Sequence, residues 1–123
     1  MNVLAVGLGG AIGAVLRYLL GQAIPRLAGG FPLGTFCINI VGCFAIGVIV
    51  ALAGRNSGID PRLVLFLQTG ICGGFTTFST FSFETVSLMD DGKIPLALLY
   101  LCASVTLGIS ALLAARYMVQ AWE

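Results

Sequence analysis

The fold of this chain is decided by one stretch near its middle, Gly70-Ile71-Cys72-Gly73-Gly74-Phe75-Thr76-Thr77-Phe78-Ser79-Thr80-Phe81-Ser82-Phe83. Its glycines weaken a helix, since each costs about 1 kcal/mol relative to alanine. Hydroxyl side chains and phenylalanines then alternate within an otherwise apolar region. In a bilayer, non-helical backbone is tolerated only where protein buries it or where it lines a polar cavity. We therefore predict a transmembrane helix broken near Gly73-Gly74, with freed carbonyls and hydroxyls that face a polar space, as in other ion-binding interrupted helices.

The composition around this stretch is that of a membrane protein. Of the 123 residues, 59% are hydrophobic and only 9% are charged, whereas about a quarter of the residues of a soluble domain are charged. A spanning helix needs about 20 mainly apolar residues. The sequence therefore predicts one all-α domain over residues 1–123, with four transmembrane helices. We place them at residues 2–20, 32–53, 61–88 and 95–117.

The composition also excludes several classes of function. A net charge of +1 argues against a nucleic-acid partner. Histidine is absent, which removes the commonest general base and metal ligand. Nothing resembles a nucleophile with its base and orienting group, so we do not expect an enzyme. The cysteines lie in apolar segments without C-x-x-C spacing, and we interpret them as small buried hydrophobes: Cys37, Cys43, Cys72 and Cys102.

Two polar side chains in the spans allow more than one interpretation, and a third has one. Arg17, near the end of the first span, is either an anchor that snorkels to the interface, which we favour, or a buried structural or ion-attracting cation. Asn39, in the second span, either makes an interhelical hydrogen bond or presents its NH2 group to a permeant anion, and the two are evenly balanced. We expect Glu84, late in the third span, to lie at the interface.

Residue spacing predicts how the helices pack and begin. Gly9 and Gly13 form a G-x-x-x-G pair on the first span, which lets a neighbouring backbone approach closely. Asp60 is placed to cap the third span, with Pro61 at its first helical position. Beyond the break, hydroxyl and phenyl side chains recur at helical spacing and give the helix one hydroxylated and one aromatic flank. Their hydroxyls could equally bond to carbonyls of their own helix.

The charges give no strong orientation signal. With four spans, both termini and the second loop share one side of the membrane. The Lys and Arg residues divide equally between the two sides: Arg55, Arg62 and Arg116 on one, and Arg17, Arg26 and Lys93 on the other. Because a bias in these residues sets orientation, the chain could insert both ways, which would permit an antiparallel homodimer.

Three segments in order, residues 9–18, 34–42 and 73–81, resemble the Fluc/CrcB fluoride channels of bacteria. The resemblance covers essentially the whole chain, and its third motif is highly specific. It implies a dual-topology antiparallel homodimer in the bacterial inner membrane, with two pores. Through these pores cytoplasmic fluoride would leave passively, which relieves its toxicity.

The resemblance also implies roles for individual residues. Asn39 would offer its amide to fluoride, a pair of phenyl rings would line the pore, a hydroxyl track would run beside them, and two positions on the last helix fit the pore. The rings are those of Phe78 and Phe81, and the hydroxyl track consists of Ser79 and Thr80. The positions on the last helix are Tyr100 and Ser104. With the partner's pair, the carbonyls of Gly73 and Thr76 would cage a structural sodium ion. The last helix departs from the family pattern at Gly108, which supplies no hydroxyl.

The residues themselves agree with a small anion. No Arg or Lys cluster exists that could form a charged ring, and the segments offer neutral donors and the positive edges of phenyl rings instead. A small multidrug antiporter, the main alternative, would need a carboxylate buried in the membrane as its proton carrier, and the first span has none. A membrane scaffold without transport activity would leave the two flanks of the third span unexplained.

Overall fold

The computed structural model describes residues 1–56 and 58–122, and these form helices joined by short loops. The first two long helices are α1 (Asn2–Ala23) and α2 (Leu33–Arg55), with the short 3-10 turn η1 (Ala28–Gly30) between them. The third span consists of α3 (Pro61–Leu65), the π-helical η2 (Phe66–Cys72), α4 (Gly73–Phe75) and α5 (Phe78–Asp90). The last helix is α6 (Ile94–Gln120).

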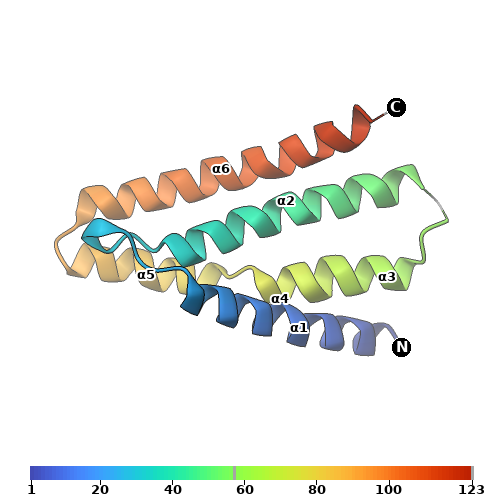
Figure 1. Cartoon of the computed structure of the whole chain (residues 1–123), viewed down its shortest axis with the longest axis horizontal. Helices are drawn as coiled ribbons and strands as arrows, with labels where there is room; N and C mark the ends of the chain where they lie inside the picture. Colours follow the sequence, from blue (N-terminus) through green and yellow to red (C-terminus); the bar gives the residue numbers. More distant parts are fainter. Residues whose placement is uncertain (57, 123) are drawn as a thin grey trace.

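The prediction of an all-helical membrane domain is confirmed. Within residues 1–56 and 58–122, four helices have the length and apolar composition needed to cross a membrane: Asn2–Ala23, Leu33–Arg55, Pro61–Asp90 and Ile94–Gln120. They lie side by side, and the two termini are at the same end of the molecule (Figure 1). Helix α2 packs along α6, and α1 packs along η2 and α4.

The third span begins as the sequence predicted. The carboxylate of Asp60 accepts a hydrogen bond of 2.8 Å from the backbone amide of Arg62, and Pro61 occupies the first turn. An acidic N-cap satisfies one of the donors that a helix start leaves without a partner, and proline lacks the amide that would otherwise be orphaned. Local sequence therefore fixes this helix end.

The break in the third span is real, but it lies at Thr76-Thr77 and not at Gly73-Gly74. Gly73 is helical, with φ −64° and ψ −39°, whereas Thr76 (φ −78°, ψ 156°) and Thr77 (φ −148°, ψ 117°) are extended. Threonine is β-branched and suits extended backbone. The Thr77 hydroxyl also accepts from the amide of Thr80, so that Thr77 caps α5.

The glycines of the third span serve packing instead. A Cβ on Gly74 would overlap the backbone oxygen of Gly10, and a Cβ on Gly70 would lie 2.9 Å from the Cα of Gly9. A Cβ on Gly13 would overlap the oxygen of Ile71. The predicted close approach along the G-x-x-x-G face of α1 is thus confirmed, because only backbones without side chains fit together at this distance.

The π-helical segment η2 was not predicted. The amide of Gly73 donates to the carbonyl of Gln68, one residue farther back than in an α-helix. Such wide turns are rare and occur often at functional sites. No local sequence pattern marks this one, and it lies where the backbones of α1 and the third span meet.

The outer surface of the bundle is strongly apolar. Only 11% of the apolar stretch of α1 is buried against the rest of the chain. Its large side chains, such as Leu4, Leu8 and Val15, are exposed. A helix surface of this kind faces lipid or another subunit.

We predict that Gly13→Ala destabilises the protein by about 1–3 kcal/mol, the usual effect of overpacking a tight contact. The matched control is Gly7→Ala on the same helix, where an added Cβ would meet nothing within 4 Å. It should leave stability unchanged or raise it slightly, because alanine is the better helix former. Thermal unfolding in detergent, followed by size-exclusion chromatography, measures both variants. Equal stability of the two variants would contradict the backbone contact.

Candidate functional site

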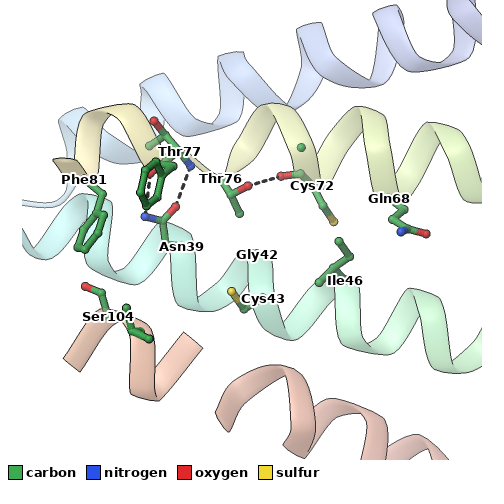
Figure 2. A pocket seen from close by; sticks show the side chains of 13 residues that line it. Asn39, Gly42, Cys43, Ile46, Gln68, Cys72, Thr76, Thr77, Phe81 and Ser104 are labelled. Atoms are coloured by element: carbon green, nitrogen blue, oxygen red, sulfur yellow. Dashed lines mark hydrogen bonds between the residues drawn. The ribbon is translucent and has the colours of Figure 1, made fainter. Parts of the chain in front are cut away.

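A cavity of about 340 Å3 lies between α2, the break of the third span and α6 (Figure 2). The residues that line it within the described part of the chain are all uncharged. They include several of the predicted pore and sodium positions: Asn39, Gly73, Thr76, Phe78, Phe81 and Ser104. Residues far apart in sequence are therefore brought to one place.

Asn39 holds the break together. Its Nδ2 donates to the backbone oxygen of Thr77 at 3.1 Å, and its Oδ1 accepts from the backbone amide of the same residue at 2.8 Å. Figure 2 shows the Asn39 side chain facing this extended backbone across the cavity edge. The interhelical hydrogen bond expected as one interpretation is thus present. An amide NH2 group carries two donors, and Thr77 takes one of them.

The carbonyls before the break lose their usual helical partners. In a continuous helix the amide of Thr77 would bond to the carbonyl of Gly73, but here it bonds to Asn39. The next carbonyl, that of Gly74, accepts a hydrogen bond of 3.1 Å from Nε of Arg17. The last turn of a helix always leaves carbonyls to be satisfied in other ways, and Arg17 of α1 supplies one of the donors that are needed.

This bond changes the interpretation of Arg17. We favoured a snorkelling anchor, yet the side chain is only partly exposed and reaches from α1 to the break. The hydrogen bond to the Gly74 carbonyl favours the structural interpretation over the snorkelling one. Arg17 also lines a polar cavity, and its role as a structural or ion-attracting cation stays a prediction.

The two predicted pore rings lie together. The ring centroids of Phe78 and Phe81 are 5.9 Å apart, with planes tilted by 48°. Phe81 is buried at 9% exposure, whereas Phe78 is 79% exposed. Phe81 also meets Tyr100 edge to face at 5.1 Å. One ring is therefore part of the core, and the other projects from the chain.

The predicted hydroxyl track begins at the cap of α5. The Thr77 hydroxyl donates to Oγ1 of Thr80 at 3.0 Å, and it lies 3.5 Å from Oγ of Ser79. Thr80 lines a second cavity of about 410 Å3, together with Arg17 and Glu84. Ser79 is exposed. The hydroxyls are close to one another, but they lead away from the first cavity toward the second.

Tyr100 and Glu84 form a polar cluster that sequence reasoning did not foresee. Tyr100 is fully buried, and its hydroxyl donates to Oε2 of Glu84 at 2.8 Å. Thr35 donates to Oε1 of the same carboxylate at 3.0 Å, and Nη2 of Arg26 lies 3.9 Å from that oxygen. The Glu84 side chain is only 12% exposed and points between the helices, while its position at the membrane interface stays a prediction.

A sequence signal for this cluster existed. Thr80 and Glu84 are one helical turn apart, so they share a face of α5. Thr35 stood inside a segment on which the family resemblance rests, but we assigned it no role. What the sequence could not supply was the arrangement of α2, α5 and α6 that brings the three polar side chains together.

Ser104 carries a polar atom without a protein partner. Its Oγ is buried, and within the described residues it makes no hydrogen bond. In Figure 2 the hydroxyl points toward the side of the cavity where Phe81 lies. An unsatisfied buried hydroxyl costs about 1–3 kcal/mol. A donor kept at this cost inside a cavity is typical of a ligand position.

The comparisons with known proteins give one consistent result. The family model for CrcB-like proteins (camphor resistance, CrcB) matches residues 4–116. Proteins named "fluoride-specific ion channel FluC" match over nearly their whole length. That of Chlorobaculum tepidum is 44% identical over 122 residues, which cover 99% of this chain and 97% of its own. Those of Chlorobium phaeobacteroides strain BS1 (43%, covering 98% of this chain and 94% of its own) and Agrobacterium fabrum (48%, covering 93% and 92%) are similar.

We predict that Asn39→Ala destabilises the fold by about 2–6 kcal/mol, because it leaves a backbone amide and a backbone carbonyl of Thr77 unpaired at about 1–3 kcal/mol each. The matched control is Asn56→Ala, which removes an exposed side-chain bond to the amide of Gly58 and should change stability by less than about 1 kcal/mol. Thermal unfolding in detergent compares the two. A similar loss for both variants would show that the Asn39 pair does not hold the break.

Proposed function

The chain is a multi-pass membrane protein of the CrcB-like family, and on this basis we propose that it is a fluoride-selective ion channel of the bacterial inner membrane. Cytoplasmic fluoride would leave through it passively, which relieves fluoride toxicity. The relatives are named as ion channels and not as enzymes. The single observation that carries the proposal is the uncharged cavity that gathers Asn39, Phe78, Phe81 and Ser104.

The chemistry of this cavity suits a small, strongly hydrogen-bonding anion. Asn39 retains a second N–H donor, and the buried hydroxyl of Ser104 has a hydrogen to give. The edges of the Phe78 and Phe81 rings carry the positive part of the aromatic quadrupole. Neutral donors of this kind can replace the hydration of an anion without trapping it. A cationic site would hold the anion more tightly and slow its release.

The hydroxyl track and Tyr100 extend this pathway in our proposal. Ser79 and Thr80 would carry the anion from the rings toward the second cavity, which Thr80 lines. Tyr100 would contribute through its ring, which meets Phe81. Its hydroxyl hydrogen is given to Glu84 in this structure, so a bond from Tyr100 to the anion would require that this hydrogen bond be exchanged.

We assign the working unit as an antiparallel homodimer with two pores. Phe78 projects from the chain beside the cavity, with 79% of its surface exposed, and a second subunit would enclose it. The apolar face of α1 gives such a subunit a surface to pack against. The equal division of Lys and Arg between the two sides allows both orientations.

A structural sodium ion completes the proposal. The residues that would hold it are Gly73 and Thr76 with their partner counterparts, through backbone carbonyls. The Gly73 carbonyl belongs to the last turn before the break and the Thr76 carbonyl to the break itself, and the amide of Thr77 bonds to Asn39 instead of Gly73. Neutral oxygen donors suit a hard cation. The ion would hold two breaks together at the dimer axis.

The test is fluoride efflux from liposomes that contain the purified protein. With a potassium gradient and valinomycin setting the voltage, we expect fluoride to leave passively, as read by a fluoride-selective electrode. Liposomes loaded with chloride should show little efflux, because the neutral donors favour the smaller anion. Absence of fluoride efflux under an imposed voltage would reject the proposed function.

Ser104→Ala separates transport from folding. The substitution removes a buried hydroxyl that has no protein partner, so stability should stay the same or rise. Fluoride flux should fall about fivefold to tenfold, the effect of losing a hydrogen bond of about 1–1.4 kcal/mol to the ion. Ser110→Ala, at an exposed position of the same helix, is the control. Unchanged flux in Ser104→Ala would remove this hydroxyl from the pathway.

A further inference from the structure

The carboxylate of Glu84 presents a problem for an anion pathway. It lines the second cavity together with Thr80, Thr77 and Thr35, which places it at the end of the proposed hydroxyl track. Its side chain is only 12% exposed. A negative charge that is screened so little by water repels an approaching anion strongly. Something must offset this charge if fluoride is to pass.

The hydroxyl groups around Glu84 do not remove its charge. Thr35 donates to Oε1 and Tyr100 donates to Oε2. Both bonds come from neutral hydroxyl groups, which bring no positive charge to the carboxylate. They stabilise the carboxylate and spread its charge, but the net charge of the cluster of these three side chains remains negative.

Arg26 is the cation that reaches this carboxylate. Its Nη2 lies 3.9 Å from Oε1 of Glu84. It belongs to the loop between α1 and η1, and its side chain is 61% exposed, so it contacts both the solution and the end of the track. Arg17 lines the same cavity, but its Nε is bonded to the carbonyl of Gly74.

We propose that Arg26 is the counter-charge of Glu84, and that this ion pair lets an anion pass the part of the second cavity that Glu84 lines. The inference rests on the proposed function and adds a positioning residue to it. Arg26 acts through Glu84: it offsets the carboxylate's charge and holds the side chain where Thr35 and Tyr100 reach it.

The experiment is a charge series at position 26, measured as fluoride efflux from liposomes. Arg26→Lys should retain most of the flux. Arg26→Gln should lower it by up to about fivefold, because solvent screening of a guanidinium that is 61% exposed limits what the ion pair contributes. Arg26→Glu should lower it further. Size-exclusion profiles of each variant report folding, and the exposed position makes misfolding an unexpected result.

Two controls make the test specific. Lys93→Gln removes the same charge from an exposed position on the same side of the membrane, and it should leave the flux unchanged. In a Glu84→Gln background no carboxylate needs offsetting, so the ratio of fluxes with and without Arg26→Gln should approach one. This ratio is informative even if Glu84→Gln itself lowers the flux.

Several results would overturn the inference. Wild-type flux in Arg26→Gln would exclude a counter-charge role while leaving the proposed function intact. An equal loss in Lys93→Gln would mean that only general surface charge matters. The same fold reduction with and without the Glu84 carboxylate would show that Arg26 acts on the anion independently of Glu84. Absence of flux in the wild-type protein would reject the proposed function and this inference with it.

Discussion

The structure depends on the pair of hydrogen bonds between Asn39 and the backbone of Thr77. A helix that breaks within a membrane exposes polar backbone groups that lipid cannot satisfy, so the break is stable only if protein groups take their place. A primary amide is suited to this task because it offers one donor and one acceptor in a plane, like a peptide group. Arg17 completes the arrangement at the carbonyl of Gly74.

The fixed break determines where the remaining polar groups lie. Because Thr77 both pairs with α2 and caps α5, the first turn of α5 is held against α2. In this part of α5, Phe78 and Phe81 line the uncharged cavity, whereas Thr80 lines the second cavity, in which the charged side chains lie. The chain thus separates a neutral region, rich in ring edges and unpaired donors, from a region in which Glu84 is surrounded by hydroxyls and arginines.

The glycines show why a residue type alone does not reveal its role. We expected Gly73-Gly74 to break the helix, since glycine lowers helix stability. Instead both residues are helical and belong to α4. Because Gly74 has no side chain, the third span can pack directly against the backbone of Gly10. The extended residues are threonines, whose β-branched side chains suit that backbone and whose hydroxyl caps the next helix.

The sequence by itself determined the number of spans, the presence of a break in the third, the capped start at Asp60 and the close packing at Gly13, because hydropathy, capping and small-residue spacing are local properties. Only the tertiary structure decided where the chain breaks, which way Arg17 points and which side chains surround the Glu84 carboxylate. These depend on partners far away in sequence, 57 residues for Arg17 and Gly74 and 49 for Thr35 and Glu84. The physical reason is that a polar group in a membrane takes its position from the partner that satisfies it, and that partner is known only when the helices are packed.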